Sequence, residues 1–349
     1  MAIISFFIGS TGEGSGQTIA AWCIGLVLRD RGLKIGFMKP FGPPADPADL
    51  SVHDPDQSLM KKVLGLRDED VAVPSPPAVM PIGTIPDPQW MARVESRYQE
   101  MMAVKDAVIV MGSRDIFFDS GGPVLPDSHF IQRQDVPVLL MARFNKDSLS
   151  IYSVLAINSF LGGRVRGVII NRVPSERLEA VGSHCIPFLT SKGVNAVGVV
   201  PEDRVLSAMM VQNVVEILGG QTITGAHRME NLVDRFALGS PLLDGPLAIF
   251  KRVYNKVILL GSGENEPPAS RVSGIVLTGG RLCADAVLQV GTELEIPLLT
   301  VPMDTFAVIE KLEQASVRLT DRDEFRALRF KDWLEKSVGI DRLIQCFSR

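Results

Sequence analysis

The sequence predicts an α/β protein in which a doubly wound parallel-sheet P-loop domain is followed by a smaller α/β domain. Short β-branched runs alternate with helical patterns, and these runs lack the polar–apolar alternation of half-exposed strands. Strands that helices cover on both faces have this continuous apolar character. A glycine-rich segment also joins the first strand to the first helix, which is typical of a phosphate-binding loop.

The elements of the first domain follow one another in βα order. Six apolar runs are predicted as strands: 2–8, 34–38, 107–111, 136–142, 165–170 and 196–200. Five segments between them are predicted as helices: 16–31, 57–64, 88–104, 148–161 and 175–192. Ligands of such sheets bind beyond the carboxyl ends of the strands, so we expect the site where segment 9–18 leaves the first strand.

Segment 9–18 reads GSTGEGSGQT and resembles a P-loop that has lost its charge. In the pattern G-x-x-x-x-G-K-[ST], backbone N–H groups and the lysine hold phosphate, and the last hydroxyl binds Mg²⁺. Thr18 matches this pattern, whereas Gln17 stands at the lysine position and Thr11 at the first glycine. Backbone N–H groups can still approach an anion at the loop glycines, which are Gly12, Gly14 and Gly16. We expect phosphate binding without fast phosphoryl transfer; the alternative is a turn that binds nothing.

Two long segments are predicted as loops near this edge of the sheet. Residues 71–88 contain six prolines, which lack N–H donors, and residues 115–126 contain a Gly-Gly-Pro sequence. Loops of this length are often functional, although both could also be inert covering segments.

After a predicted helix at 206–218, which Gly219 and Gly220 close, the pattern starts again. Three strands are predicted at 256–260, 274–278 and 297–301, and three helices at 284–294, 305–314 and 322–337. We therefore expect two domains, 1–220 and 221–349.

Composition narrows the class of protein. The chain has 349 residues and a net charge of −4, so it lacks the basic footprint of a nucleic-acid-binding protein. No apolar run approaches the roughly 18 to 20 residues that span a bilayer, and the N-terminus enters a strand directly. We expect a soluble cytoplasmic protein without membrane contact. The four cysteines and four histidines are dispersed, which predicts neither disulfides nor a zinc site.

Further short motifs follow the loop in a fixed order: MKPF at 38–41, DPD at 54–56, LMKKVLG at 59–65, VIINRVP at 168–174, VGVVPEDRVLS at 197–207, GIVLTGG at 274–280 and VPMDT at 301–305. In this order they resemble the N-terminal part of long bacterial phosphate acetyltransferases, which joins a dethiobiotin-synthetase-like P-loop domain to a DRTGG domain. Segment 260–270 departs from that pattern, because it lacks the Asp-Arg pair. The acetyltransferase domain would follow Arg349, so we expect no phosphate acetyltransferase activity from this chain alone.

The P-loop domain also looks like dethiobiotin synthetase and cobyrinic acid a,c-diamide synthase, which activate a carboxyl group with ATP and Mg²⁺. This resemblance implies that Thr18 and Asp56 hold Mg²⁺, that Lys39 contacts the phosphate or reacting groups, and that Asn171 contacts the base. The residues alone leave alternatives: Asp56 as a helix N-cap, Lys39 as a solvent-facing lysine, and Asn171 as a turn residue.

Two departures weaken the predicted chemistry. Gln17 removes the P-loop charge, and Met111 stands where the related enzymes have an acidic residue at a strand end. A thioether cannot replace an oxygen ligand of Mg²⁺. Because phosphoryl transfer depends mainly on charges placed around phosphate, both losses predict slow or absent catalysis.

We therefore favour a regulatory or scaffolding protein that senses ATP, another nucleotide or an anion, with Mg²⁺ weak or absent. A Mg-ATP-dependent carboxylate-activating enzyme and a partner subunit for an enzyme of acetyl-CoA metabolism are the alternatives. We also expect a homo-oligomer built through the second domain, whose strands at 275–277 and 298–301 are strongly apolar.

Overall fold

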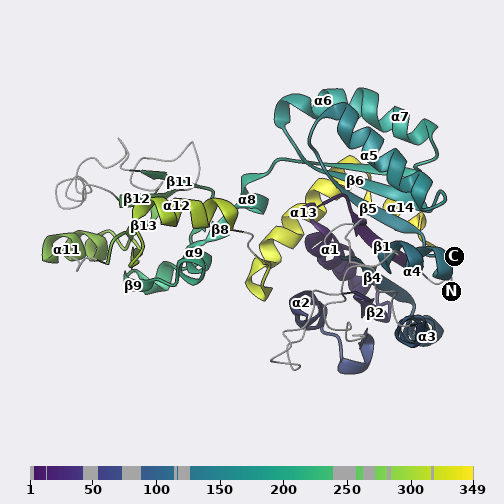
Figure 1. Cartoon of the computed structure of the whole chain (residues 1–349), viewed down its shortest axis with the longest axis horizontal. Coiled ribbons are helices and arrows are strands. Elements are labelled where there is room, and N and C mark those ends of the chain that lie inside the picture. The colour runs from purple at the N-terminus through teal and green to yellow at the C-terminus, as the bar shows by residue number, and fades with distance from the viewer. Residues whose placement is uncertain are drawn as a thin grey trace. The chain divides into compact units, whose positions relative to one another are not determined.

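The computed structural model describes residues 4–12, 14–41, 54–72, 88–113, 116, 126–238, 257–261, 272–280, 284–315 and 318–348. The chain forms two compact units (Figure 1). Unit 1 combines residues 1–203 with 319–349, and unit 2 consists of residues 204–318. Unit 2 is therefore an insertion in the sequence of unit 1.

Unit 1 is built on a seven-stranded sheet in which every pairing is parallel, in the order β3-β2-β4-β1-β5-β6-β7. The strands are β1 (Ile4–Ser10), β2 (Ile35–Met38), β3 (Val71–Ala72), β4 (Ala107–Met111), β5 (Val138–Arg143), β6 (Val165–Val173) and β7 (Ala196–Pro201). This confirms the predicted parallel sheet. Because β1 lies between β4 and β5, the loop that follows it opens at the centre of the carboxyl edge.

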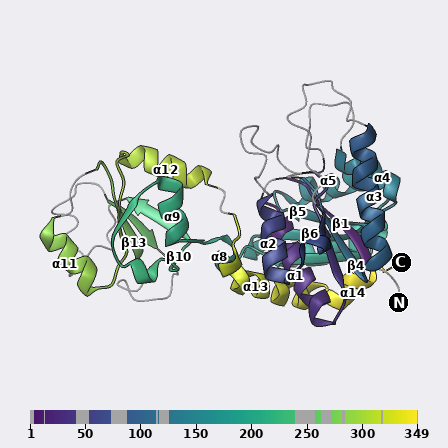
Figure 2. The same ribbon diagram turned by 90° about the horizontal axis from the view of Figure 1, so that it is seen from below.

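Helices cover both faces of this sheet (Figure 2). One face packs against α3 (Pro88–Val104), α4 (Pro126–Gln134), α5 (Asp147–Phe160), α6 (Leu178–Ala180) and α7 (Ile186–Ser191), the last two joined by a π-helical turn. Tyr98 and Phe130 are fully buried there and pack edge to face, with their ring centroids 5.4 Å apart. The other face packs against α1 (Gln17–Asp30), α2 (Pro55–Leu64), α13 (Glu324–Ser337) and α14 (Ile340–Gln345).

The last two helices belong to unit 1, and not to the second domain that the sequence predicted for 221–349. The Asp203 carboxylate, just after β7, accepts hydrogen bonds from Nε of Arg329 and Nε1 of Trp333, both at 2.8 Å. Phe347 stacks on Phe6 of β1 at 4.8 Å. Without these helices an apolar face of the sheet would meet water, so the structure divides the chain at 203 and 318 where 220 was expected.

Unit 2 is a smaller α/β unit with a five-stranded sheet in the order β11-β12-β13-β14-β9. Its β13 and β14 pair in parallel, and its other pairs are antiparallel. A separate antiparallel pair joins β8 to β10. The strands are β8 (Met209–Met210), β9 (Gln221–Thr224), β10 (Leu232–Val233), β11 (Arg235–Leu238), β12 (Val257–Gly261), β13 (Val272–Leu277) and β14 (Leu298–Thr300).

The four helices of unit 2 among the described residues are α8 (Arg204–Ser207), α9 (Val211–Leu218), α11 (Asp285–Glu293) and α12 (Thr305–Gln314). α9 and α12 pack on one face of the sheet, and α11 packs on the other. Ile275 and Leu298 are consequently fully buried. The apolar strands that suggested an association surface thus form the core of the unit.

Most of the two predicted loops at 71–88 and 115–126, and of segment 260–270, lies outside the described residues. In the described part of the chain, none of the helices has the length and apolar character required to cross a membrane. Cys23, Cys185 and Cys346 are unpaired thiols. Burial raises the pKa of the Cys23 thiol to about 12, so this thiol is an inert core group.

Candidate functional site

The glycine-rich loop connects β1 to α1 and is held by its own polar groups. The Ser10 hydroxyl donates to the Gly12 carbonyl at 2.6 Å and accepts from the Gly12 N–H at 3.0 Å. The Ser15 hydroxyl donates to the same carbonyl at 2.6 Å. Gly14 and Gly16 have φ of 68° and 98°, which L side chains rarely adopt. Among the described residues, no side chain caps the start of α1, whose N-cap is Gly16, and N–H groups at such a helix start can bind an anion.

Thr11, at the position of the first P-loop glycine, ties the loop to β5. Its N–H donates to the Met141 carbonyl at 3.0 Å, and its hydroxyl accepts from the Arg143 N–H at 3.2 Å. The backbone at Thr11 is hydrogen-bonded to β5 and is not left-handed, so a glycine is not required at this position of the loop.

Gln17, at the lysine position, turns away from the loop. Its side-chain amide donates to the Ile8 carbonyl of β1 at 3.1 Å. Met111 ends β4 and is 1% exposed, so its side chain is a core group. The two departures seen in the sequence therefore leave neutral side chains where the related enzymes have charges.

Lys39, Asp54, Asp56 and Thr18 form one cluster beside the start of α1. Nζ of Lys39 lies 2.5 Å from Oδ2 of Asp56 and 2.8 Å from Oδ2 of Asp54. The Thr18 hydroxyl donates to Oδ1 of Asp56 at 3.0 Å. The structure thus brings together Thr18 and Asp56, the predicted magnesium pair, and places the Lys39 ammonium against the same carboxylate.

The cluster decides between the alternatives left open for these residues. Lys39 is only 7% exposed, so the solvent-facing interpretation is wrong. Asp54, and not Asp56, caps α2, because its Oδ1 accepts from the N–H groups of Asp56 and Gln57 at 2.9 and 3.3 Å. Burial opposes the charge of Lys39, but the two carboxylates outweigh it and raise the pKa of Lys39.

Asn171, near the end of β6, clamps the loop. Its Nδ2 donates to the Ser15 carbonyl at 2.9 Å, and its Oδ1 accepts from the Arg172 N–H at 2.9 Å. The side chain is 7% exposed, and a methyl group on Gly16 would lie 2.7 Å from its Nδ2. Asn171 therefore helps to shape the loop by holding the Ser15 carbonyl, a role that the sequence did not indicate.

Two arginines at the same edge were not predicted as site residues: Arg143 ends β5, and Arg172 lies beside Asn171. Burial, and next the charge of Arg143, lower the pKa of Arg172, while Glu202 acts in the opposite sense. An arginine at the carboxyl end of a buried strand was the signal available in the sequence for both.

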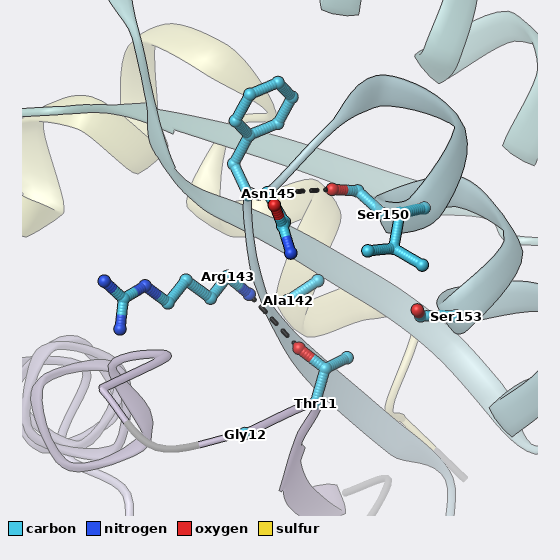
Figure 3. A pocket seen from close by; sticks show the side chains of 9 residues that line it. Thr11, Gly12, Ala142, Arg143, Asn145, Ser150 and Ser153 are labelled. Atoms are coloured by element: carbon cyan, nitrogen blue, oxygen red, sulfur yellow. Dashed lines mark hydrogen bonds between the residues drawn. The ribbon is translucent and has the colours of Figure 1, made fainter.

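A pocket of about 570 Å³ opens beside the loop (Figure 3). It is lined by Thr11, Gly12, Ala142, Arg143, Phe144, Asn145, Leu149, Ser150 and Ser153. The Ser150 hydroxyl accepts from the Asn145 N–H at 3.1 Å and fixes the turn into α5. Among the described residues, no group of three or more His, Cys, Asp or Glu side chains could hold a metal ion.

A parallel sheet with a glycine-rich loop between its central strand and the following helix defines a P-loop type of α/β protein. The chain belongs to the family described as AAA domain, which its residues 5–210 match. Residues 213–315 match the family described as DRTGG domain. Both findings agree with the resemblance seen in the sequence.

Two relatives extend this relationship. The phosphate acetyltransferase of Pseudomonas aeruginosa is 23% identical over 377 residues, which cover 98% of this chain and 52% of that protein. The enzyme of Nitrosomonas europaea is 22% identical, with 98% of this chain and 51% of that protein covered. The chain is thus related to the N-terminal part of phosphate acetyltransferases and spans about half of their length.

Among solved structures, the MinD cell division protein of Aquifex aeolicus is similar over 57% of this chain and 83% of its own, with 15% identity and a TM-score of 0.35. These values are too low to support any functional argument.

Proposed function

We propose that unit 1 binds ATP or another phosphate-bearing ligand and acts as a sensor in a regulatory or scaffolding protein, without steady phosphoryl transfer. The observation that carries this proposal is the Gln17 side chain, which is neutral and donates its hydrogen bond to the Ile8 carbonyl of β1. The loop keeps its glycines and the uncapped start of α1, which bind an anion through backbone N–H groups.

The cluster around Lys39 supports the absence of turnover. Its ammonium is held between Asp54 and Asp56, so its charge is already balanced within the protein. Gln17 and Met111 contribute no charge. Since phosphoryl transfer relies on positive charges around the transferred group, the remaining groups favour binding over transfer.

A second candidate is a Mg-ATP-dependent carboxylate-activating enzyme. The 3.0 Å hydrogen bond between Thr18 and Asp56 favours it, because these oxygens are the ligands that the related enzymes use for Mg²⁺. In that case Lys39 would move from Asp56 to the substrate when the metal binds.

The relationship to phosphate acetyltransferases supports a further proposal about partners. A chain that is related to half of those proteins is suited to act beside an enzyme of acetyl-CoA metabolism, in the position that the N-terminal half occupies within one polypeptide.

Isothermal titration with ATP, ADP and GTP, with and without Mg²⁺, tests the sensor proposal. We expect weak binding that Mg²⁺ hardly changes, together with no steady ATP hydrolysis. A turnover number near the enzyme median of about 10 s⁻¹ would instead support the carboxylate-activating enzyme.

Gln17→Lys provides the matched gain-of-binding variant. A restored charge-assisted hydrogen bond contributes roughly 1.5–3 kcal/mol, so ATP should bind at least tenfold more tightly. If neither the wild type nor Gln17→Lys binds ATP, the loop is a turn that binds nothing.

A further inference from the structure

Two arginines lie at the carboxyl ends of β5 and β6, and one of them, Arg143, approaches the glycine-rich loop. Arg143 and Asn171 are register partners at the ends of these strands, which places Arg172 next to Arg143. Nη1 of Arg143 lies 3.6 Å from the position of a methyl group on Gly14. In Figure 3 the Arg143 side chain extends from the strand end toward the loop.

Arg143 and Arg172 carry like charges on adjacent strand ends, and the charge of Arg143 helps to lower the pKa of Arg172. Within the described parts of the chain, neither forms an ion pair with a carboxylate. Arg172 also has φ of 59°, a left-handed conformation that is uncommon for a residue with a side chain. Like charges and a strained backbone at one place are features that cluster at binding sites.

Neither of the two positions expected to supply a cation to the loop offers a free charge. Gln17 is neutral, and Lys39 is held between two carboxylates on the opposite side of the loop. Arg143 and Arg172 therefore supply positive charge at this edge of the described chain, with the Glu202 carboxylate acting on Arg172 in the opposite sense. A guanidinium offers a planar pair of N–H donors that matches phosphate oxygens, which suits it to this role.

We infer that Arg143 and Arg172 bind the phosphate groups of the ligand in place of the lysine missing at Gln17. The anion then lies over Gly14, between the backbone N–H groups of the loop and the two guanidinium groups. This inference rests on the proposed binding function and names its ligand class: a diphosphate or triphosphate that enters from the β5–β6 side. The adjoining pocket offers Asn145, Ser150 and Ser153 to the rest of the ligand.

The test is titration of the full chain with ATP and with inorganic tripolyphosphate, which isolates phosphate recognition from base recognition. Arg143→Ala and Arg172→Gly should each lower the affinity for both ligands about tenfold or more. This is the loss expected for one charge-assisted hydrogen bond. Glycine is used at 172 because it accepts the positive φ. Arg143→Lys keeps the positive charge, so it should lose less binding affinity than Arg143→Ala.

Arg166→Ala is the matched control, because Arg166 is an exposed arginine at the other end of β6. Its affinity should equal that of the wild type. Adding Gln17→Lys to Arg143→Ala should restore affinity, since both supply a cation to one anion. Thermal unfolding of each variant reports whether the fold is intact.

The outcomes separate the two proposals. Wild-type binding that Arg143→Ala and Arg172→Gly leave unchanged would overturn this inference and keep the binding function. No binding of either ligand by the wild type would overturn both. An equal loss of affinity in Arg166→Ala would mean that only the overall charge of the protein matters. That result would also overturn the inference.

Discussion

At the scale of single residues, Lys39 has a large expected effect on stability. Lys39→Met would leave the buried Asp54 carboxylate without its cation. Breaking a buried ion pair by removing one partner costs about 3–5 kcal/mol, and we expect a loss of that size in urea unfolding. Lys62→Met is the matched control on α2, because the Lys62–Asp321 pair is exposed. It should cost less than about 1 kcal/mol. Equal losses would contradict the prediction.

The pH dependence of the Lys39 effect follows from its raised pKa. A group whose pKa is higher in the folded state stabilises the fold fully when the pH is below its pKa in the unfolded chain. For lysine that unfolded pKa is about 10.4. That stabilisation is lost as the pH rises through the folded pKa. The difference between wild type and Lys39→Met should therefore be constant between pH 7 and 9 and shrink only in more alkaline solution.

Gly16→Ala tests whether the conformation of the loop matters for binding. The variant places a methyl group 2.7 Å from Nδ2 of Asn171 at φ of 98°, so the loop must shift. A left-handed residue with a side chain costs roughly 1–2 kcal/mol, and we expect lower stability together with weaker ATP binding in titration. Gly182→Ala is the control, because its methyl group would meet open space. Wild-type affinity in Gly16→Ala would contradict the prediction.

The residue scale also shows what the sequence could predict of the site. Spacing located the loop, and the resemblance to the carboxylate-activating enzymes pointed to Thr18 and Asp56, which the structure brings together. The roles of Gln17 and Asn171 were not predictable, since each depends on a backbone carbonyl brought close by the fold. Arg143 was missed because no motif contains it.

At the scale of elements, the pattern predicted six of the parallel strands of unit 1, since each is a continuous apolar run. It missed β3, which has only two residues. It also predicted α13 but could not assign it to the sheet it covers. That assignment rests on Asp203, which bonds Arg329 and Trp333 from more than a hundred residues away.

This assignment predicts how the chain can be shortened. Residues 1–203 joined by a flexible Gly/Ser linker to 319–349 should fold cooperatively, because they include α13 and α14. Residues 1–203 alone should bind a dye for exposed apolar surface and lack a sharp thermal transition. Cooperative unfolding of residues 1–203 alone would show that these helices are dispensable.

At the scale of the whole molecule, the proposed homo-oligomer needs an exposed apolar surface on unit 2. Phe306, at the start of α12, is 78% exposed, although the strands first considered are buried. We predict that the protein associates in solution and that Phe306→Ser weakens association, as measured by light scattering. Leu328→Ser, at a half-exposed apolar position on α13 of unit 1, is the control. A monomeric wild type would refute the proposal.

The return of the chain to unit 1 also has a consequence for biosynthesis. A ribosome adds roughly 5–20 residues per second, so all of unit 2 is made before α13 and α14 exist. Unit 2 can fold as soon as it emerges from the ribosome. Strand β1 is synthesised earlier, but its Phe6 stays without its stacking partner until Phe347 has been made. The first-made part of the protein is therefore the last to be completed, and its nascent sheet is the natural target for chaperones that bind apolar surface.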